Sequence, residues 1–227
     1  MPAATPLFSP AALARCVPFF VFMALLALRG YLPDDLGLDA RWIYGAQALV
    51  VAGLLAWYWR GYGELARQNL PDAREGALAV VVGIAVFALW VKLDAPWMQL
   101  GAATASFVPL DANGALIWPL VALRLAGAAL VVPVMEELFW RSFLMRWAQH
   151  PGFERVDPRT VGLKAVVLST FVFTLAHTLW LAAVVAGLAY AWLYRRSGKL
   201  WTAVIAHAVT NGMLGVWVIW TGRWEFW

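Results

Sequence analysis

The sequence predicts an all-α protein, a polytopic membrane helix bundle with about seven transmembrane helices in a single integral membrane domain, residues 1–227. Composition is the first reason, because 63% of the residues are hydrophobic and only 13% are charged, whereas about a quarter of the residues of a soluble domain are charged. The second reason is that long apolar runs alternate with polar or turn-forming segments. The third is that many of the fifteen tryptophans stand near the ends of these runs, as in the aromatic belts of membrane proteins.

The boundaries of the expected helices come from the segments that interrupt the apolar runs. Residues 29–41 are rich in turn formers, residues 60–75 carry arginines, and residues 94–115 form the longest loop of the first half. In the second half, residues 151–164 are polar and basic, and a short basic segment at 195–199 precedes the last run. The expected helices are therefore residues 17–28, 42–59, 76–91, 120–146, 165–179, 182–194 and 200–220.

The fifth and sixth runs follow one another almost without a polar residue, although the chain must reverse direction between them if Lys164 and Arg195 are to lie on the same face. Non-helical backbone at membrane depth is tolerated only where protein or a water-filled cavity surrounds it. We therefore expect a turn near residues 178–182 that helps to line a site.

The distribution of Lys and Arg predicts the orientation, because these residues are enriched on the cytoplasmic side of membrane proteins. With the N-terminus inside, the outer segments hold four of them: Arg29, Arg41, Lys92 and Arg223. The inner segments then hold eleven: Arg15, Arg60, Arg67, Arg74, Arg146, Arg155, Arg159, Lys164, Arg195, Arg196 and Lys199. We predict a protein of the cytoplasmic (inner) membrane with a cytoplasmic N-terminus.

Charge and cysteine content exclude several classes of partner and site. The net charge of +4 is dispersed over segment ends instead of forming one basic face, so the lipid bilayer is the expected partner and nucleic acid is not. Cys16 is the only cysteine, which excludes an intramolecular disulfide and a cysteine-based metal site. Arg124, near the outer end of its run, is interpreted as a residue that snorkels to the interface.

The most unusual stretch is a pair of adjacent carboxylates, Glu136 and Glu137, inside the apolar run 120–146. A carboxylate at this depth costs ~2.5–3.5 kcal/mol on insertion scales, so it faces the protein interior or a water-filled cavity. On a helix Glu137 and Arg141 are four residues apart and can pair, whereas Glu136 points about 100° away. The pattern predicts a supporting ion pair between Glu137 and Arg141, and a partner for Glu136 elsewhere in the fold.

Three further polar side chains fall at a similar depth. At ~1.5 Å per residue, Glu136 lies ~15 Å from the inner face, His177 ~20 Å, His207 ~12 Å and Asn211 ~18 Å. His207 and Asn211 are four residues apart and share one helix face. We expect these four side chains to converge on one cavity that opens towards the cytoplasm.

These residue types suit hydrolysis. A carboxylate can serve as the general base that takes a proton from water, and histidine can help to hold that water. Histidine and asparagine can also donate hydrogen bonds to a developing oxyanion. A serine route is not indicated, because the sequence has no Gly-x-Ser-x-Gly elbow and Cys16 precedes the first helix.

The chain resembles the CPBP intramembrane proteases, the family that includes the CAAX prenyl endopeptidases and the bacteriocin-processing or immunity proteins once called Abi proteins. The resemblance covers about residues 120–215, the motif-bearing core, and rests on three motifs in order: Glu136-Glu137-x-x-x-Arg141, Phe173-x-x-x-His177 and His207-x-x-x-Asn211. The short, tryptophan-rich form is also similar to CAAX-protease-related proteins found with bacterial exosortase systems.

The resemblance implies a role for each motif residue. Glu136 would activate water together with His177, and His207 and Asn211 would form the oxyanion site. Glu137 and Arg141 would brace the helix. The expected function is an intramembrane endopeptidase of the glutamic type, without a metal cofactor, that acts on a membrane-associated peptide or protein with or without a lipid anchor.

Three alternatives remain at this point. Glu136, His177 and His207 could instead be three zinc ligands with water as the fourth, although no His-Glu-x-x-His is present. The chain could also be a non-catalytic membrane scaffold or immunity protein that kept the family's helices. A proton-coupled transporter would use buried Glu and His as well, but seven helices without an internal repeat argue against it.

Overall fold

The computed structural model describes residues 9–29, 39–101 and 107–227, and these form a bundle of helices without a named strand. The first three helices are α1 (Pro10–Arg29), α2 (Arg41–Tyr58) and α3 (Ala73–Trp90). A long fourth helix combines α4 (Trp118–Ala126), α5 (Val132–Glu137) and α6 (Arg146–Gln149), and it is followed by α7 (Leu163–Leu175), α8 (Trp180–Ser197) and α9 (Leu200–Thr221). The all-α polytopic class is confirmed.

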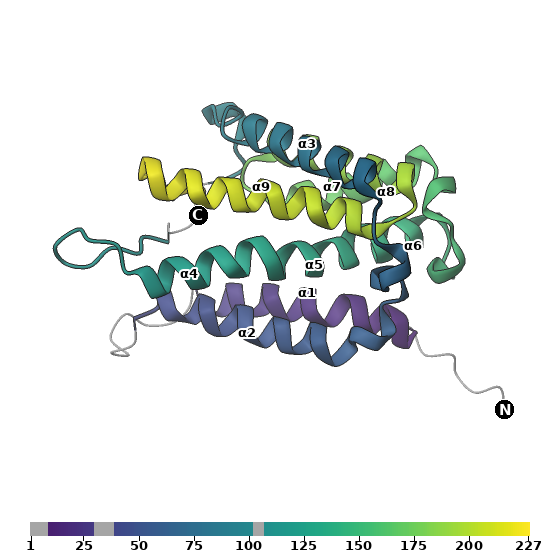
Figure 1. Ribbon diagram of the computed structural model, residues 1–227, viewed down its shortest axis with the longest axis horizontal. Coiled ribbons are helices and arrows are strands. Elements are labelled where there is room, and N and C mark those ends of the chain that lie inside the picture. Colours follow the sequence, from purple (N-terminus) through teal and green to yellow (C-terminus); the bar gives the residue numbers. More distant parts are fainter. Residues whose placement is uncertain (1–8, 30–38, 102–106) are drawn as a thin grey trace.

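The helices lie in rows on either side of the long helix. In Figure 1, α3 and α9 lie together along one edge, α1 and α2 along the other, and α4 to α6 run between them. The contact between α3 and α9 is close, because a Cβ added at Gly83 would come within 2.5 Å of the Ala206 carbonyl oxygen. Gly187 allows the same closeness between α7 and α8, where an added Cβ would come within 2.8 Å of Thr170.

In the part of the chain that the structure describes, five helical segments are long and apolar enough to cross a membrane: Pro10–Leu28, Arg41–Gly61, Ala73–Trp90, Trp118–Gln149 and Leu200–Thr221. Helix α7 has 13 residues, about 20 Å at 1.5 Å per residue, which is shorter than the ~30 Å hydrocarbon core. It forms a hairpin with α8, whose last turn contains Arg195 and Arg196. The fifth and sixth of the seven predicted spanning helices, residues 165–179 and 182–194, are therefore the two arms of this hairpin.

The reversal between α7 and α8 occupies residues 176–179, slightly before the predicted 178–182. The loop after α3 provides partners for its backbone, since the Leu100 N–H donates to the Thr178 carbonyl at 2.7 Å. The Trp180 indole donates to the Trp97 carbonyl at 3.1 Å. Non-helical backbone is thus covered by protein at this depth, as the low polarity of a membrane requires.

The long helix is irregular on both sides of its carboxylates. Gly127–Val131 and Leu138–Met145 are π-helical, and the six residues of α5 lie between them. Pro133 supplies a local cause, because proline lacks the N–H of the helical ladder and its ring clashes with the carbonyl four residues earlier. π-helical turns in a helix are frequent at functional sites.

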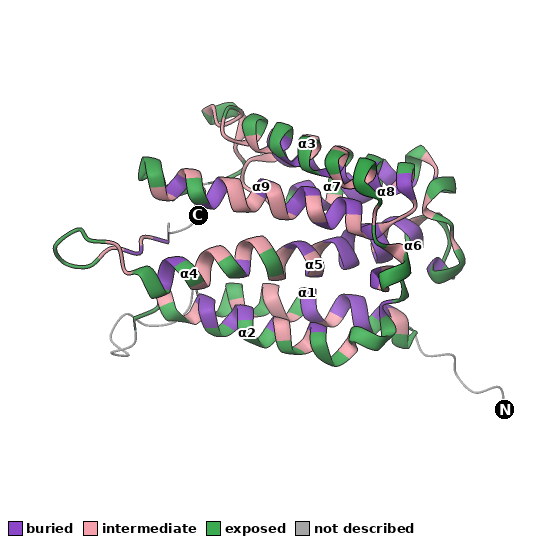
Figure 2. Cartoon of the chain, viewed as in Figure 1, coloured by how far each residue is buried: buried purple, intermediate pink, exposed green. Residues whose placement is uncertain are grey.

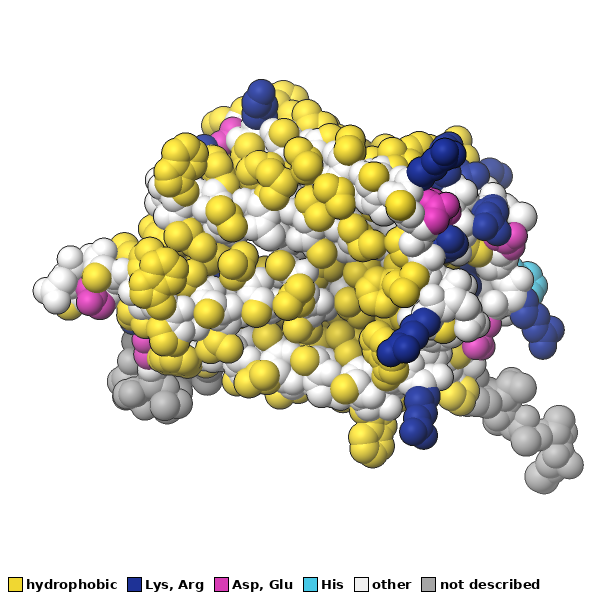
Figure 3. Space-filling view, viewed as in Figure 1, with side chains coloured by type: hydrophobic (Ala, Val, Ile, Leu, Met, Phe, Trp, Pro, Cys, Tyr) yellow, Lys and Arg dark blue, Asp and Glu magenta, His cyan; other side chains and the backbone are white. Residues whose placement is uncertain are grey.

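The two ends of the bundle differ in charge, whereas its flanks are apolar. In Figure 3, Lys and Arg gather at the end that carries α6 and the start of α1, and hydrophobic side chains cover the flank between the ends. Exposed residues lie along the outer sides of α1, α2 and α3 in Figure 2, and they include Trp57, which is 82% exposed, and Leu49, 68%. Such a broad exposed apolar surface is the lipid-facing surface of an integral membrane protein.

The basic end is tied together by a buried network. Arg15 donates to both carboxylate oxygens of Glu64, at 2.8 Å and 2.6 Å, and the Ser142 hydroxyl donates to the same carboxylate. Arg146 donates to Ser142 Oγ at 2.7 Å. These contacts fasten α1 and the loop after α2 to the long helix.

Candidate active site

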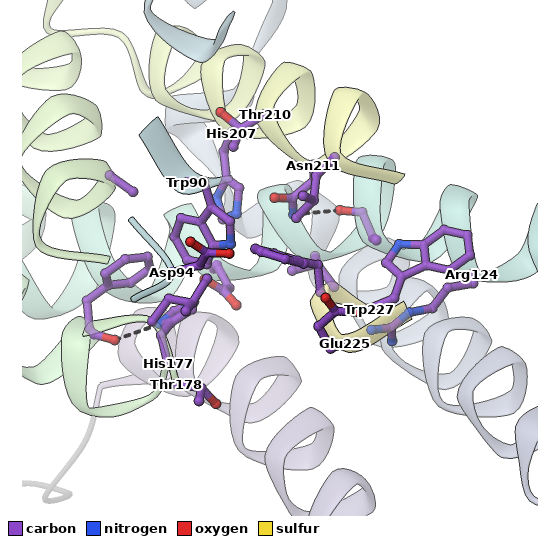
Figure 4. A pocket seen from close by; sticks show the side chains of 18 of the residues that line it. Trp90, Asp94, Arg124, His177, Thr178, His207, Thr210, Asn211, Glu225 and Trp227 are labelled. Carbon is purple, nitrogen blue, oxygen red and sulfur yellow. Dashed lines mark hydrogen bonds between the residues drawn. The ribbon is translucent and has the colours of Figure 1, made fainter. Parts of the chain in front are cut away.

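A cavity of about 570 Å³ lies between the long helix, the α7–α8 hairpin and α9. Figure 4 shows His207 and Asn211, both from α9, and His177, from just after α7, around this cavity. Its wall includes all four residues that the sequence indicated, Glu136, His177, His207 and Asn211. The expected convergence on one cavity is therefore present.

The two adjacent carboxylates have different surroundings. Glu137 is fully buried, and its Oε1 accepts hydrogen bonds from Arg141 Nη1 at 3.1 Å and from His207 Nδ1 at 2.9 Å. Glu136 lines the cavity, and Oε2 of each carboxylate is buried without a hydrogen-bond partner among the described residues. The two residues therefore differ as the helix geometry requires, one facing the packed core and the other the cavity.

His177 stands just after the end of α7, where the helical ladder stops. Its Nδ1 is 2.8 Å from the Phe173 carbonyl oxygen, and because a carbonyl only accepts, Nδ1 carries the proton and Nε2 is the acceptor of the neutral ring. The ring packs against Phe173, with centroids 4.2 Å apart, and edge-on to Trp90 at 5.8 Å. Phe173 thus holds the histidine through both its carbonyl and its ring.

His207 is oriented from two sides. Glu137 accepts the hydrogen bond of its Nδ1, and the ring stacks on Tyr190 with centroids 5.0 Å apart and an interplanar angle of 20°. Tyr190 is itself fixed, because its hydroxyl donates to Thr210 at 2.8 Å, and Thr210 donates to the Gly83 carbonyl at 2.9 Å. This chain links α8, α9 and α3 around the ring.

Asn211 is anchored to the first π-helical segment of the long helix. Its Nδ2 donates to the Ala128 carbonyl at 2.9 Å. The amide has two N–H groups and one carbonyl, so one N–H and Oδ1 remain for groups in the cavity.

Arg141 connects the long helix to both arms of the hairpin. The predicted ion pair with Glu137 is present, and Nη2 also donates to the Gly187 carbonyl at 3.4 Å. The guanidinium lies 4.6 Å from the Phe173 ring centroid and 5.4 Å from that of Tyr190. His207 binds the same Glu137 carboxylate as Arg141. The sequence analysis did not predict this contact, because two residues so far apart in the chain leave no local sequence signal of their pairing.

The mouth of the cavity lies at the end of the bundle opposite the basic network. Arg223 there pairs with Asp94 at 2.9 Å and with Glu225 at 2.7 Å, and all three residues line the cavity. The sequence analysis expected the cavity to open on the side of the basic segments, whereas these lining residues lie at the opposite end of the bundle. Sequence reasoning missed these residues because loop contacts between chain segments far apart leave no periodic pattern.

Arg124 also differs from its prediction. Its side chain lines the cavity instead of snorkelling to the outer interface. The guanidinium lies 4.1 Å from the ring centroid of Tyr44 and 5.5 Å from that of Phe107. Tyr44 and Phe107 hold the Arg124 guanidinium on the side of the helix that faces the protein. The position of Arg124 in the sequence could not indicate that side.

The zinc alternative requires a group of converging ligands. Within residues 9–29, 39–101 and 107–227, no three His, Cys, Asp or Glu side chains are placed closely enough to hold a metal ion. The two histidines nevertheless each have an acceptor for Nδ1, as metal-binding histidines commonly do.

Comparison with known proteins agrees with the sequence motifs. Residues 117–213 match a family model described as type II CAAX prenyl endopeptidase Rce1-like, and the matched segment contains all the motif residues. The match confirms the predicted family resemblance. No curated protein and no solved structure gives a significant match to the chain.

Proposed function

From the membership of residues 117–213 in the type II CAAX prenyl endopeptidase Rce1-like family, we propose that this integral membrane protease cleaves a peptide bond with a water molecule activated by Glu136. The single observation that carries the proposal is the asymmetry of the carboxylates. Oε1 of Glu137 is bound by Arg141 and His207 and Glu137 does not line the cavity, whereas Glu136 lines it.

The reaction begins with proton transfer from water to the Glu136 carboxylate, while the water oxygen attacks the carbonyl carbon of the scissile bond. The Nε2 of His177 can accept a hydrogen bond from the same water, because Nδ1 is engaged by Phe173. As the tetrahedral intermediate collapses, the carbon–nitrogen bond breaks and Glu136 returns the proton to the leaving nitrogen. Glu136 is thereby regenerated as a carboxylate.

His207 and Asn211 stabilise the oxyanion in this scheme. Asn211 offers the N–H that Ala128 does not use. His207 can donate from Nε2 only as an imidazolium, because its Nδ1 proton is already directed to Glu137. The hydrogen bond to Glu137 fixes the orientation of that ring, which gives Glu137 a positioning role as well as a structural one.

The substrate in this proposal is a membrane-associated peptide or protein, with or without a prenyl or other lipid group. The cavity wall is apolar over part of its surface, with Phe22, Leu26, Val132 and Leu214 among its lining residues. This surface suits an apolar peptide segment or a lipid chain. The family description names a prenylated substrate class, and the apolar wall is compatible with it.

The orientation is part of the proposal. Eleven Lys and Arg fall in the segments that the sequence assigns to one side, against four in those of the other, and Lys and Arg gather at the end that carries α6 in Figure 3. The rule that positive loops remain in the cytoplasm then puts the N-terminus and the basic network inside. The membrane is the cytoplasmic one.

Zinc-dependent hydrolysis is the second candidate, favoured by the Nδ1 hydrogen bonds of both histidines. Glu136, His177 and His207 are the candidate ligands of this alternative, but no three His, Cys, Asp or Glu side chains among the described residues lie close enough together to hold the ion. A non-catalytic scaffold is the third, because a family domain can be retained without activity.

Purified protein in detergent, incubated with lipidated and unlipidated peptides, distinguishes the three. Glu136→Gln keeps the side-chain shape but cannot take the proton of water, so cleavage should be lost while thermal unfolding is unchanged. Glu154→Gln, which removes an exposed carboxylate outside the cavity, is the matched control and should cleave normally.

Chelator treatment separates the two catalytic candidates. The glutamate mechanism predicts unchanged activity after long incubation with chelator. Loss of activity on chelation and recovery with added zinc would establish the zinc mechanism instead. Full activity of Glu136→Gln would remove Glu136 from the chemistry, and no cleavage of any peptide by wild-type protein would favour the scaffold.

A further inference from the structure

The position of the cavity mouth relative to the charged ends of the bundle identifies the side from which a substrate arrives. One end carries the basic network of Arg15, Glu64, Ser142 and Arg146 and the ion pair of Lys199 with Glu75. The other end carries the loop after α3 and the C-terminal residues, joined by the ion pair of Arg223 with Asp94.

Each spanning helix that lines the cavity contributes lining residues from the part of its length that is remote from the basic end. On the long helix the lining residues are Arg124, Ala128, Val132 and Glu136, spaced by four along one face towards the Trp118 end. The run from Arg124 to Glu136 covers about 18 Å at 1.5 Å per residue. Helix α9 continues the wall from His207 to Leu214, and Arg223, Glu225, Phe226 and Trp227 follow at the mouth.

The basic end is closed beneath the carboxylate layer. Arg141 and Met145 are almost fully buried there, at 2% and 0% exposure. Below them, the guanidinium groups of Arg15 and Arg146 lie 5.4 Å and 5.5 Å from the ring centroid of Phe153. This packing lies between the cavity and the basic end, and the lining residues continue to the opposite end, where Asp94, Arg223 and Glu225 are.

We propose that the substrate enters from the non-cytoplasmic face, so that the cleaved polypeptide is an exported, membrane-associated segment. This inference rests on the proposed peptidase function and on the positive-inside orientation. The chemical consequence is that the scissile bond has crossed the membrane, or is embedded in its outer leaflet, before it reaches Glu136.

Single-cysteine labelling tests the orientation without any need for activity. The only native cysteine, Cys16, is removed as Cys16→Ala, and cysteines are introduced singly at the mouth end as Asn113→Cys or Glu225→Cys, and at the basic end as Arg67→Cys or Glu154→Cys. All four native residues are exposed. In spheroplasts of an expression host, a membrane-impermeant maleimide should label the mouth-end cysteines, and should label the basic-end cysteines only after lysis. The reverse pattern would overturn the proposal.

A second measurement tests access to the site itself. In proteoliposomes, cleavage of externally added peptide should rise with the fraction of molecules whose Asn113→Cys, which does not line the cavity, is labelled from outside, and should be absent in the Glu136→Gln background. Cleavage that instead rises with the fraction labelled at Arg67→Cys would overturn the entry route. If no peptide is cleaved in any orientation, the peptidase function fails, while the labelling result still decides which face the mouth occupies.

A bulky maleimide at the mouth gives an independent readout. Modification of Glu225→Cys should reduce cleavage relative to the same protein before modification, because this residue lines the cavity. Modification of Arg67→Cys should leave cleavage unchanged. Inhibition from the Arg67 side alone would show that the entrance is at the basic end.

Discussion

The imidazole of His207 and the carboxylate of Glu137, seventy residues apart in the chain, are joined by a 2.9 Å hydrogen bond between Nδ1 and Oε1. The same oxygen accepts from Arg141, so one buried carboxylate fixes both an arginine that braces the α7–α8 hairpin and a histidine in the cavity wall. Glu137 therefore has a different role from the adjacent Glu136. Four predictions follow, for Glu137, Asn211, Arg141 and Glu64.

Glu137→Gln should lower kcat about ten- to hundred-fold, the range seen when a partner that orients a functional side chain is lost. The amide can still accept a hydrogen bond from His207, but it no longer offers a negative charge to a protonated ring. KM should change little, because Glu137 does not line the cavity wall. Steady-state kinetics on a peptide substrate measure both constants. A normal kcat together with a raised KM would instead assign Glu137 to substrate binding.

Asn211→Ala should lower kcat by about 10²–10³-fold if its remaining N–H stabilises the oxyanion. Asn69→Ala is the matched control, since Asn69 also donates to a backbone carbonyl, that of Gly63 at 2.8 Å, but lies outside the cavity. The control should retain wild-type kinetics. Equal losses in the two variants would show that the effect at Asn211 is not specific to the cavity.

Arg141→Ala should reduce the folded yield in membranes as well as activity. Removing one partner of a buried ion pair costs about 3–5 kcal/mol, because the other charge is left uncompensated, and here the hairpin also loses its contact at Gly187. Thermal unfolding in detergent, followed by gel filtration, measures the effect. A variant with normal yield and unfolding temperature but no activity would move Arg141 from structure to catalysis.

Stability should fall in acid through Glu64. Burial opposes ionisation of this carboxyl, but the hydrogen bonds and charge of Arg15, with the hydrogen bond from Ser142, outweigh burial and hold its pKa below the ordinary value. A lowered folded-state pKa stabilises the protein above the unfolded-state pKa of about 4.3, and this contribution is lost as the pH falls through the folded-state pKa.

The unfolding temperature of the wild-type protein, measured from neutral pH down through this range, should therefore fall. Glu64→Gln should start lower at neutral pH and fall less over the same range. An identical pH dependence in the two proteins would mean that another group controls acid stability.

Much of the fold and of the motif set could be predicted from the sequence, because both depend on local properties of the chain. Apolar runs that lie in a bilayer are expected to be helical, since a helix satisfies its backbone hydrogen bonds within one segment. The four-residue spacing of Glu137 and Arg141 is sufficient for their ion pair, and the matching depths of Glu136, His177 and His207 follow from the helical rise.

The tertiary structure alone decided how these elements meet. The partner of His207, the anchoring of Asn211 on Ala128 and the rotation of Arg124 towards Tyr44 depend on which helix faces pack together. The end of the bundle at which the cavity has its mouth depends on packing at both ends. A buried network closes the basic end, and loops surround the mouth at the opposite end. Helical periodicity determines the direction of a side chain relative to its own helix axis, but the group that it contacts is determined by how the helices pack against each other.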